Sequence, residues 1–311
     1  MSTIINVSNL SKEYKELKAV DNLSFSVNKG EVYGFLGQNG AGKSTTIRML
    51  MTLIAPSSGK MELFGMDLQT HRNEILQNVG AVIERPDLYK YLTAEENLRL
   101  FARMSGIRPD EKLLDEQLER VGLLARKNSK VKTFSQGMKQ RLGLAVALVH
   151  DPQLIILDEP TNGLDPQGIA DVRNLILHLS KHLGKTVFVS SHLLSEIEMI
   201  ADRMLIIDKG KKIIEGSVKD LFDPTNMLVE MEIQNLQPAY EIIATTIWKD
   251  NIKSKLGRGV LFQIDKKQIP ALTSELSAKG VEILAIQPRH SLEAYFLSLT
   301  TANQHVDHFT N

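Results

Sequence analysis

Residues 37–45 of the chain read GQNGAGKST, which fits the pattern G-x-x-x-x-G-K-[ST] of a phosphate-binding loop. A nucleoside triphosphate carries several negative charges on a compact tail. Glycines at positions 37, 40 and 42 would let the backbone approach that tail closely and turn its amides toward it. The loop therefore predicts that Gly37, Gly40 and Gly42 surround the phosphates of a nucleotide.

The sequence on both sides of the loop supports this prediction. Residues 32–36 have the pattern of a short buried strand, and residues 46–51 that of a helix. A helix that begins near residue 42 would direct its positive end at the phosphates. Lys43 would then reach the β- and γ-phosphates, and the Ser44 hydroxyl would hold Mg²⁺.

The composition is that of a globular protein with an even charge balance. The chain has 311 residues, of which 42% are hydrophobic and 24% charged, enough for one large domain and a small one. Lys+Arg and Asp+Glu both number 37, which argues against a dominant nucleic-acid surface, so no nucleic-acid partner is expected. With 0 Cys, the chain offers no disulfide framework and no thiolate metal site.

Membrane-targeting signals are not evident in the sequence. Residues 1–15 lack the charged-then-apolar layout of a signal peptide. Apolar runs such as residues 142–149 are far shorter than the roughly 20 residues that a membrane-spanning helix needs. We expect the chain not to cross a membrane, so any membrane role would come through a partner.

Residues 1 to about 222 alternate strand and helix patterns, as a layered parallel sheet does. Strands are predicted at residues 4–7, 23–27, 32–36, 60–64, 79–83, 154–157, 186–190, 204–208 and 212–215, and further helices at 71–78, 169–183 and 193–201. From residue 93 the pattern becomes helical, beginning with Thr93 and Glu96 as a capping box. A second helix follows Pro109 and ends near Gly122, and a third covers residues 136–149. Helices without an intervening strand predict an inserted helical lobe over about residues 91–149.

The pattern restarts after a predicted linker at residues 223–226. Residues 227–300 predict a small α+β domain without a catalytic constellation, and residues 301–311 a tail. Its predicted strands are residues 229–233, 260–264 and 281–286, and its predicted helices are residues 240–248, 269–278 and 291–299.

Two acids end a strand that should be buried. Asp158 and Glu159 follow the apolar residues 154–157, at the sheet edge where open α/β sheets bind ligands. Asp158 is the expected Mg²⁺ anchor, and Glu159 the candidate general base for an attacking water. The alternative is that both acids are merely solvated at the start of a loop.

Three further residues have both a functional and a structural interpretation. His192 follows the strand at residues 186–190, where it would contact the γ-phosphate or the water, or serve structure alone. Ser135 would cap the third helix, and a capped helix start is also a second phosphate site. Tyr14, expected in a loop, would stack on a base or lie half-buried.

Together these stretches resemble the ATP-binding subunit of an ABC transporter. GQNGAGKST resembles the Walker A motif of that family, LIILDEP its Walker B motif and FSQGMKQR its signature. Residues 163–166 resemble the D-loop, and residues 191–192 the switch histidine. Order and spacing agree across residues 1 to about 220. The resemblance implies an α/β P-loop (RecA-like) ATPase core with an inserted helical subdomain, and ATP and Mg²⁺ as cofactors.

The resemblance also implies roles for individual residues. Lys43, Glu159 and His192 would take part in catalysis, and Ser44, Asp158 and Glu84 would bind Mg²⁺. The nucleotide would be contacted by Tyr14, Gly37, Asn39, Gly40, Gly42, Lys43, Ser44, Thr45, Glu84, Ser135, Gly137, Asp158 and Asp165.

The mechanism that the resemblance implies needs partners. A second ATP-binding subunit, forming a homodimer, would pair head to tail, so that ATP on one copy is capped by the Ser135 segment of the other. The helical subdomain would relay closure to a separately encoded integral membrane permease, at the cytoplasmic face of the cell membrane.

Two departures from the family pattern stand out. The signature has Phe134 and Gln136 where Leu and Gly are usual and Met138 in place of the closing Gln, but it keeps Gly137. Glu84 stands where the Q-loop glutamine is usual, and it adds a charge that Mg²⁺ would tolerate and the γ-phosphate would repel.

Three stretches narrow the resemblance: VIERPDLYKYLTAEENL, GMKQRLGLA and SLEAYFLSLT are similar to the bacitracin and lantibiotic self-protection subfamily. That subfamily exports peptide antibiotics or similar amphiphiles through ABC-2-type permeases.

Two alternatives stay open. One is a soluble ABC ATPase of translation or repair, although this chain has one Walker A motif and no heptad run. The other is a nucleotide-sensing regulator without productive hydrolysis, which Glu84 would allow.

Overall fold

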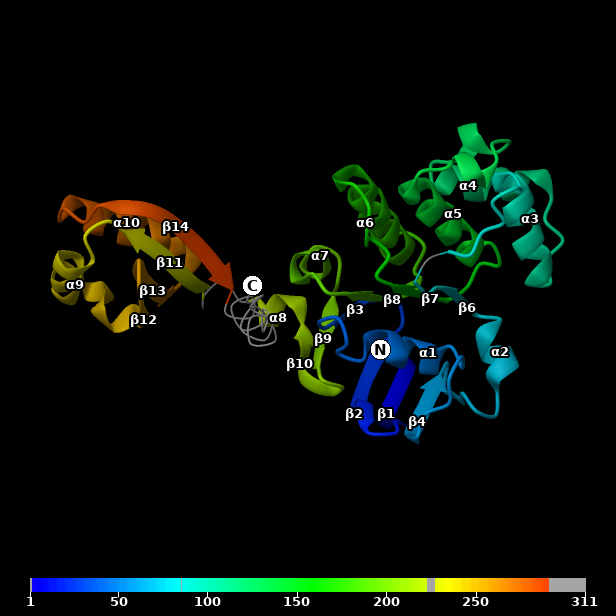
Figure 1. Cartoon of the computed structure of the whole chain (residues 1–311), viewed down its shortest axis with the longest axis horizontal. Helices are drawn as coiled ribbons and strands as arrows, with labels where there is room; N and C mark the ends of the chain where they lie inside the picture. Colours follow the sequence, from blue (N-terminus) through cyan, green and yellow to red (C-terminus); the bar gives the residue numbers. More distant parts are fainter. Residues whose placement is uncertain (1, 85, 223–226, 291–311) are drawn as a thin grey trace, which may run out of the picture. The chain divides into compact units, whose positions relative to one another are not determined.

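The computed structural model describes residues 2–84, 86–222 and 227–290. Contacts divide the chain into two compact units, Met1–Ser217 and Val218–Asn311 (Figure 1). The predicted linker at residues 223–226, the predicted helix at residues 291–299 and the predicted tail lie outside the described residues.

A six-stranded sheet forms the centre of the first unit. In spatial order its strands are β10 (Lys211–Ser217), β9 (Arg203–Asp208), β3 (Val32–Leu36), β8 (Thr186–Ser191), β7 (Leu154–Asp158) and β6 (Val79–Val82). All neighbours are parallel except β10 and β9. Every residue of β3, β7 and β8 is buried, as their apolar runs predict for strands covered on both faces. The predicted α/β architecture is confirmed.

A second, antiparallel sheet corrects one expectation. Its strands, in spatial order, are β2 (Leu17–Asn28), β1 (Thr3–Tyr14), β4 (Ser58–Leu63) and β5 (Met66–Asp67). A single layered parallel sheet over residues 1–222 was therefore the wrong expectation, because alternation reveals a strand but not its partner. Tyr14, expected in a loop, ends β1, and the short connection to Leu17 makes the two long strands antiparallel neighbours.

The helices of the first unit separate into two groups. Those of the core are α1 (Lys43–Leu50), α2 (Arg72–Leu76), α6 (Pro166–Lys181) and α7 (Leu194–Glu198). The helical lobe, visible in Figure 1, contains α3 (Ala94–Met104), α4 (Glu111–Arg120), the 3₁₀ turns η1 (Leu124–Arg126) and η2 (Val131–Thr133), and α5 (Gln136–Leu148). The capping box of Thr93 and Glu96 is confirmed, and Gly122 follows α4 with φ +66°. Among the described helices, none is both long and apolar enough to span a bilayer.

An aromatic cluster joins the two sheets. Phe25 of β2 stacks on Tyr33 of β3 and on Phe188 of β8, with ring centroids 5.9 and 6.0 Å apart. Phe35 of β3 lies 5.3 Å from Phe188. Rings at these separations gain stabilisation beyond the area they bury, so the cluster fixes the antiparallel sheet against the central one.

The second unit has the strand and helix order β-α-β-β-α-β after a short helix, α8 (Val218–Leu221). Its antiparallel strands, in spatial order, are β12 (Ile252–Leu256), β13 (Gly259–Ile264), β11 (Met227–Ile233) and β14 (Ile283–His290). Its helices are α9 (Leu236–Ala244), α10 (Ile269–Ala278) and the 3₁₀ turns η4 (Ile247–Asn251) and η5 (Lys266–Gln268). The prediction of one helix over residues 240–248 was wrong. The helix α9 begins earlier, because Pro238 is tolerated in a first turn, and the 3₁₀ turn η4 is a separate element.

A polar network lies beside the aromatic cluster. Arg203 pairs with Glu31 at 3.2 Å and with Glu215 at 3.1 Å, and its guanidinium carbon lies 5.5 Å from the Tyr33 ring centroid. Burial, followed by the nearby Glu215 carboxylate, raises the pKa of Tyr33, so its hydroxyl stays protonated and donates to Glu215 at 2.8 Å. The network connects β3, β9 and β10.

Replacing the cation of this network, Arg203→Ala, should lower the free energy of unfolding by about 2–4 kcal/mol, because the largely buried Glu31 loses the cation it pairs with and Glu215 keeps only Lys212. Urea unfolding followed by circular dichroism measures the change. Lys112→Ala, which breaks an exposed pair with Glu116, is the control and should change it by less than about 0.5 kcal/mol. Equal effects of the two substitutions would contradict a stabilising role for the network.

Candidate active site

The glycine-rich loop between β3 and α1 is held against two strands of the core. Gly42 has φ +106°, and a Cβ there would lie 2.5 Å from the carbonyl oxygen of Ala19 in β2. A Cβ on Gly37 would lie 2.6 Å from the carbonyl oxygen of Ile207 in β9. Since contacts this short do not occur, both positions require glycine, and the backbone of the loop is fixed by its packing.

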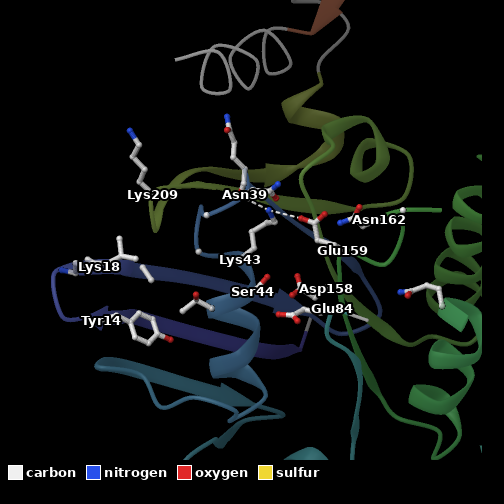
Figure 2. A pocket seen from close by; sticks show the side chains of 18 of the residues that line it. Tyr14, Lys18, Asn39, Lys43, Ser44, Glu84, Asp158, Glu159, Asn162 and Lys209 are labelled. Atoms are coloured by element: carbon white, nitrogen blue, oxygen red, sulfur yellow. Dashed lines mark hydrogen bonds and ion pairs between the residues drawn. The ribbon is translucent and has the colours of Figure 1, made fainter. Parts of the chain in front are cut away.

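Lys43, the first residue of α1, is buried, with 5% of its surface exposed. Its Nζ donates to the carbonyl oxygens of Gly37 and Gln38 at 2.6 and 3.1 Å and lies 3.1 Å from Glu159 Oε1. Figure 2 shows the ammonium and the carboxylate directed toward each other. The predicted phosphate-binding lysine and the predicted general base are therefore in contact.

Ser190, near the end of β8, positions the two acids at the end of β7, Asp158 within the strand and Glu159 just after it. Its hydroxyl donates to Asp158 Oδ1 at 2.6 Å and accepts from the Glu159 backbone amide at 2.9 Å. Asp158 is 1% exposed, and its Oδ2 has no hydrogen-bond partner among the described residues. Sequence reasoning missed Ser190, because nothing local marks a serine in a buried strand as a support for acids on its neighbour.

The segments that follow β7 and β8 contact each other at Glu159. Its backbone has φ +49°, a left-handed conformation that is uncommon outside glycine. His192 Nδ1 contacts its second carboxylate oxygen, Oε2. Glu196 of α7 accepts hydrogen bonds from Thr161 Oγ1 at 2.8 Å and Ser191 Oγ at 3.0 Å, which ties the residues next to Glu159 to those next to His192.

A cavity of about 910 Å³ opens over the loop. Ten of the predicted site residues line it: Tyr14, Asn39, Gly40, Gly42, Lys43, Ser44, Thr45, Glu84, Asp158 and Glu159. Figure 2 shows Tyr14 at one end and Ser44, Asp158 and Glu84 close together. The structure thus gathers side chains that are 145 residues apart in the sequence, from Tyr14 to Glu159.

The other predicted residues are not among those that line the cavity. The Gly37 carbonyl binds Lys43, and His192 reaches the site through Glu159. Ser135 caps α5, accepting from Met138 N at 3.3 Å, as its N-cap position predicted. Asp165 caps α6 by accepting from Gly168 N at 2.9 Å.

Comparison with known proteins identifies the family of the chain. The ABC transporter family matches residues 20–162. The bacitracin transport ATP-binding protein BcrA of Bacillus licheniformis is 42% identical over 310 residues, which cover 96% of this chain and 98% of that protein. The lantibiotic transport ATP-binding protein SrtF of Streptococcus pyogenes is 41% identical over 212 residues, 68% of this chain and 90% of that one.

The chain belongs to the ATP-binding proteins of ABC transporters. It is an ATPase subunit of such a transporter. Among solved structures, it is similar to a dimeric, post-hydrolysis ATP-binding cassette bound to ADP and Pi, with a TM-score of 0.63 and 26% identity. That similarity covers 69% of this chain and 99% of the other.

The cavity of this ABC ATPase is also lined by residues that were not among the predicted site residues, although Gln38, Gln136 and Gly163 belong to motifs named from the sequence. The additional residues are Leu17, Lys18, Ala19, Gln38, Gln136, Gln140, Asn162, Gly163 and Lys209. Lys18 lies on the strand after Tyr14, where it pairs with Asp21 at 2.7 Å. The hydrogen bond that Lys18 donates to the Asp21 carboxylate raises the pKa of Lys18, which favours the charged form of the side chain. The position of Lys18 depends on the pairing of β1 with β2, which no local pattern reveals.

The residues of the site fit a nucleotide with a divalent cation. The buried Asp158 Oδ2 and Gln38 Nε2 lack hydrogen-bond partners among the described residues, and both belong to side chains that line the cavity. A carboxylate oxygen suits a hard cation, and an amide N–H suits a phosphate oxygen. Lys43 adds a fixed positive charge where the loop meets α1.

Removing that charge, Lys43→Ala, should raise the dissociation constant for ATP by about 10- to 100-fold, since a hydrogen bond to a charged group contributes roughly 1.5–3 kcal/mol. Isothermal titration calorimetry with ATP gives the constant directly. Lys60→Ala is the control, because Lys60 is an exposed lysine of β4 that does not line the cavity. Unaltered affinity in Lys43→Ala would count against binding of phosphate at this loop.

Proposed function

We propose that the chain binds ATP with Mg²⁺ and hydrolyses it to power a membrane exporter of peptide antibiotics or similar amphiphiles. The observation that carries the catalytic part is the convergence of Lys43, Asp158 and Glu159 in one cavity. The substrate class is supported by the bacitracin and lantibiotic transport proteins to which the chain is similar over most of its length.

Nucleotide binding would use both ends of the cavity. Tyr14 is half-exposed at the end of β1, where its ring can stack on the base. The loop amides from Gly40 to Thr45 and the start of α1 would hold the phosphates. Ser44 and Asp158, with Glu84 beside them, offer the oxygen atoms that would hold Mg²⁺, which would neutralise charge on the phosphates.

Hydrolysis would depend on Glu159 as a general base. Phosphate oxygens compete with the Glu159 carboxylate for the Lys43 ammonium, so binding of the triphosphate would free that carboxylate to orient a water. Glu159 would take a proton from this water while the water oxygen forms a bond to the γ-phosphorus. The bond from the γ-phosphorus to the oxygen of the leaving ADP would break in the same step. His192, in contact with Glu159, would hold the carboxylate in position.

The signature segment supports a site shared between two copies. Ser135 and Gly137 begin α5, and Leu164 next to Asp165 lies close to Gly137, with Cδ2 3.9 Å from a Cβ built there. A capped helix start of this kind suits a second phosphate contact. Two copies paired head to tail would bring this segment over the ATP of the partner, and the similar dimeric cassette supports such pairing.

Coupling to transport would require a separate permease. The helical lobe of α3, α4 and α5 adjoins Glu84 through the segment that precedes Thr93, so it is placed to pass on closure of the site. We propose that the permease is separately encoded and integral to the membrane. The ATPase would bind to it peripherally, at the cytoplasmic face.

Converting the proposed base to its amide, Glu159→Gln, should lower steady-state ATP turnover by about 100-fold or more, since general base catalysis contributes 10²–10⁴-fold. ATP binding persists, so ATP-bound dimers should accumulate and can be measured by size-exclusion chromatography with light scattering. Glu116→Gln, on the exposed face of α4, is the control. Unchanged turnover in Glu159→Gln would refute the assignment of the base.

A further inference from the structure

Three features of Glu84 bear on nucleotide binding. It follows β6 with φ +62°, a left-handed backbone conformation that is uncommon outside glycine. Its side chain lines the cavity. The same cavity is lined by Ser44 and Asp158, the residues proposed to hold Mg²⁺, which are labelled with Glu84 in Figure 2.

The Glu84 carboxylate is not left as a free negative charge. Arg48, in the last turn of α1, contacts Glu84 Oε1 through its guanidinium. The other strong cation of the loop region, Lys43, is already engaged by the Gly37 and Gln38 carbonyls and by Glu159. Arg48 therefore supplies the counter-charge for the acid at position 84.

We propose that Arg48 is a positioning residue for nucleotide binding: it neutralises Glu84 and so permits a carboxylate beside the phosphates. The inference rests on the proposed function, because it assumes that ATP binds in this cavity. Without Arg48, the Glu84 carboxylate loses the contact that holds it and can turn toward a triphosphate of the same sign, so the nucleotide binds more weakly.

A role in folding does not account for the pair. The side chains of Arg48 and Glu84 are 42% and 59% exposed, and ion pairs at such exposure contribute little to stability. The positive charge of Arg48 is also favourable at the C-terminal end of α1 irrespective of Glu84. The contribution specific to the pair is therefore electrostatic and local to the cavity.

Divalent cations separate this proposal from a general effect of charge. Mg²⁺ between Glu84 and the phosphates would screen their repulsion, so loss of Arg48 should matter more in EDTA than in excess Mg²⁺. Added salt should weaken the effect in both conditions, because exposed charges are screened.

The test is a double-mutant cycle on the full chain with Arg48→Gln, Glu84→Gln and the double variant, measuring the dissociation constant for ATP by calorimetry. Arg48→Gln should raise the constant about fivefold in EDTA while Glu84 is present, and less than about twofold when position 84 is already changed by Glu84→Gln. Thermal unfolding midpoints of the four proteins should agree within a few degrees, which shows that all are folded.

Arg99→Gln serves as the matched control, since it breaks an ion pair with Glu95 on α3 whose residues do not line the cavity. It should leave the constant unchanged. An equal loss of affinity from Arg48→Gln in both backgrounds, or no loss in either, would overturn the proposal while leaving the proposed function intact. Absence of ATP binding by the unaltered chain would instead overturn the proposed function, and this inference with it.

Discussion

A buried ammonium must be compensated, and the site of this ATPase is built around that constraint. Lys43 is almost fully enclosed and satisfies its charge with two loop carbonyls and the Glu159 carboxylate. The contact ties the phosphate-binding loop to the end of β7, and through α1 to the core. Phosphates compete for the same ammonium, so binding of the nucleotide would at the same time free the Glu159 carboxylate from its pair with Lys43.

The acids of the site stand where strands end and the backbone is strained. Glu84 after β6 and Glu159 after β7 both have positive φ, and both line the cavity. Strain of this kind persists only when the surroundings over-determine it. For Glu159 the surroundings are Ser190 and His192, and for Glu84 they include Arg48. The ends of parallel strands lie at the same edge of the sheet, so side chains that are far apart in the sequence meet there in one site.

Local patterns predicted much of this arrangement, and tertiary pairing explains the rest. The loop around Lys43 and the capping box of Thr93 were predictable, because each depends on residues a few positions apart. The contact of Arg48 with Glu84 joins residues 36 apart in the sequence, so it depends on tertiary packing and no local pattern reveals it. The antiparallel pairing of β1 with β2 was missed although only two residues separate them, because the region around Tyr14 was interpreted as a loop. The strand β12 was missed because its alternation spans only five residues.

Head-to-tail pairing across the nucleotide is the central claim, and this chain suits a direct test, because it contains 0 Cys. Two single-cysteine proteins, Asn39→Cys and Gln136→Cys, each also carrying Glu159→Gln to block hydrolysis, would be mixed with ATP and Mg²⁺ and oxidised. A disulfide-linked species of doubled mass should form in the mixture with nucleotide and not without it. A mixture that stays monomeric with ATP, or crosslinks equally without it, would contradict the shared site.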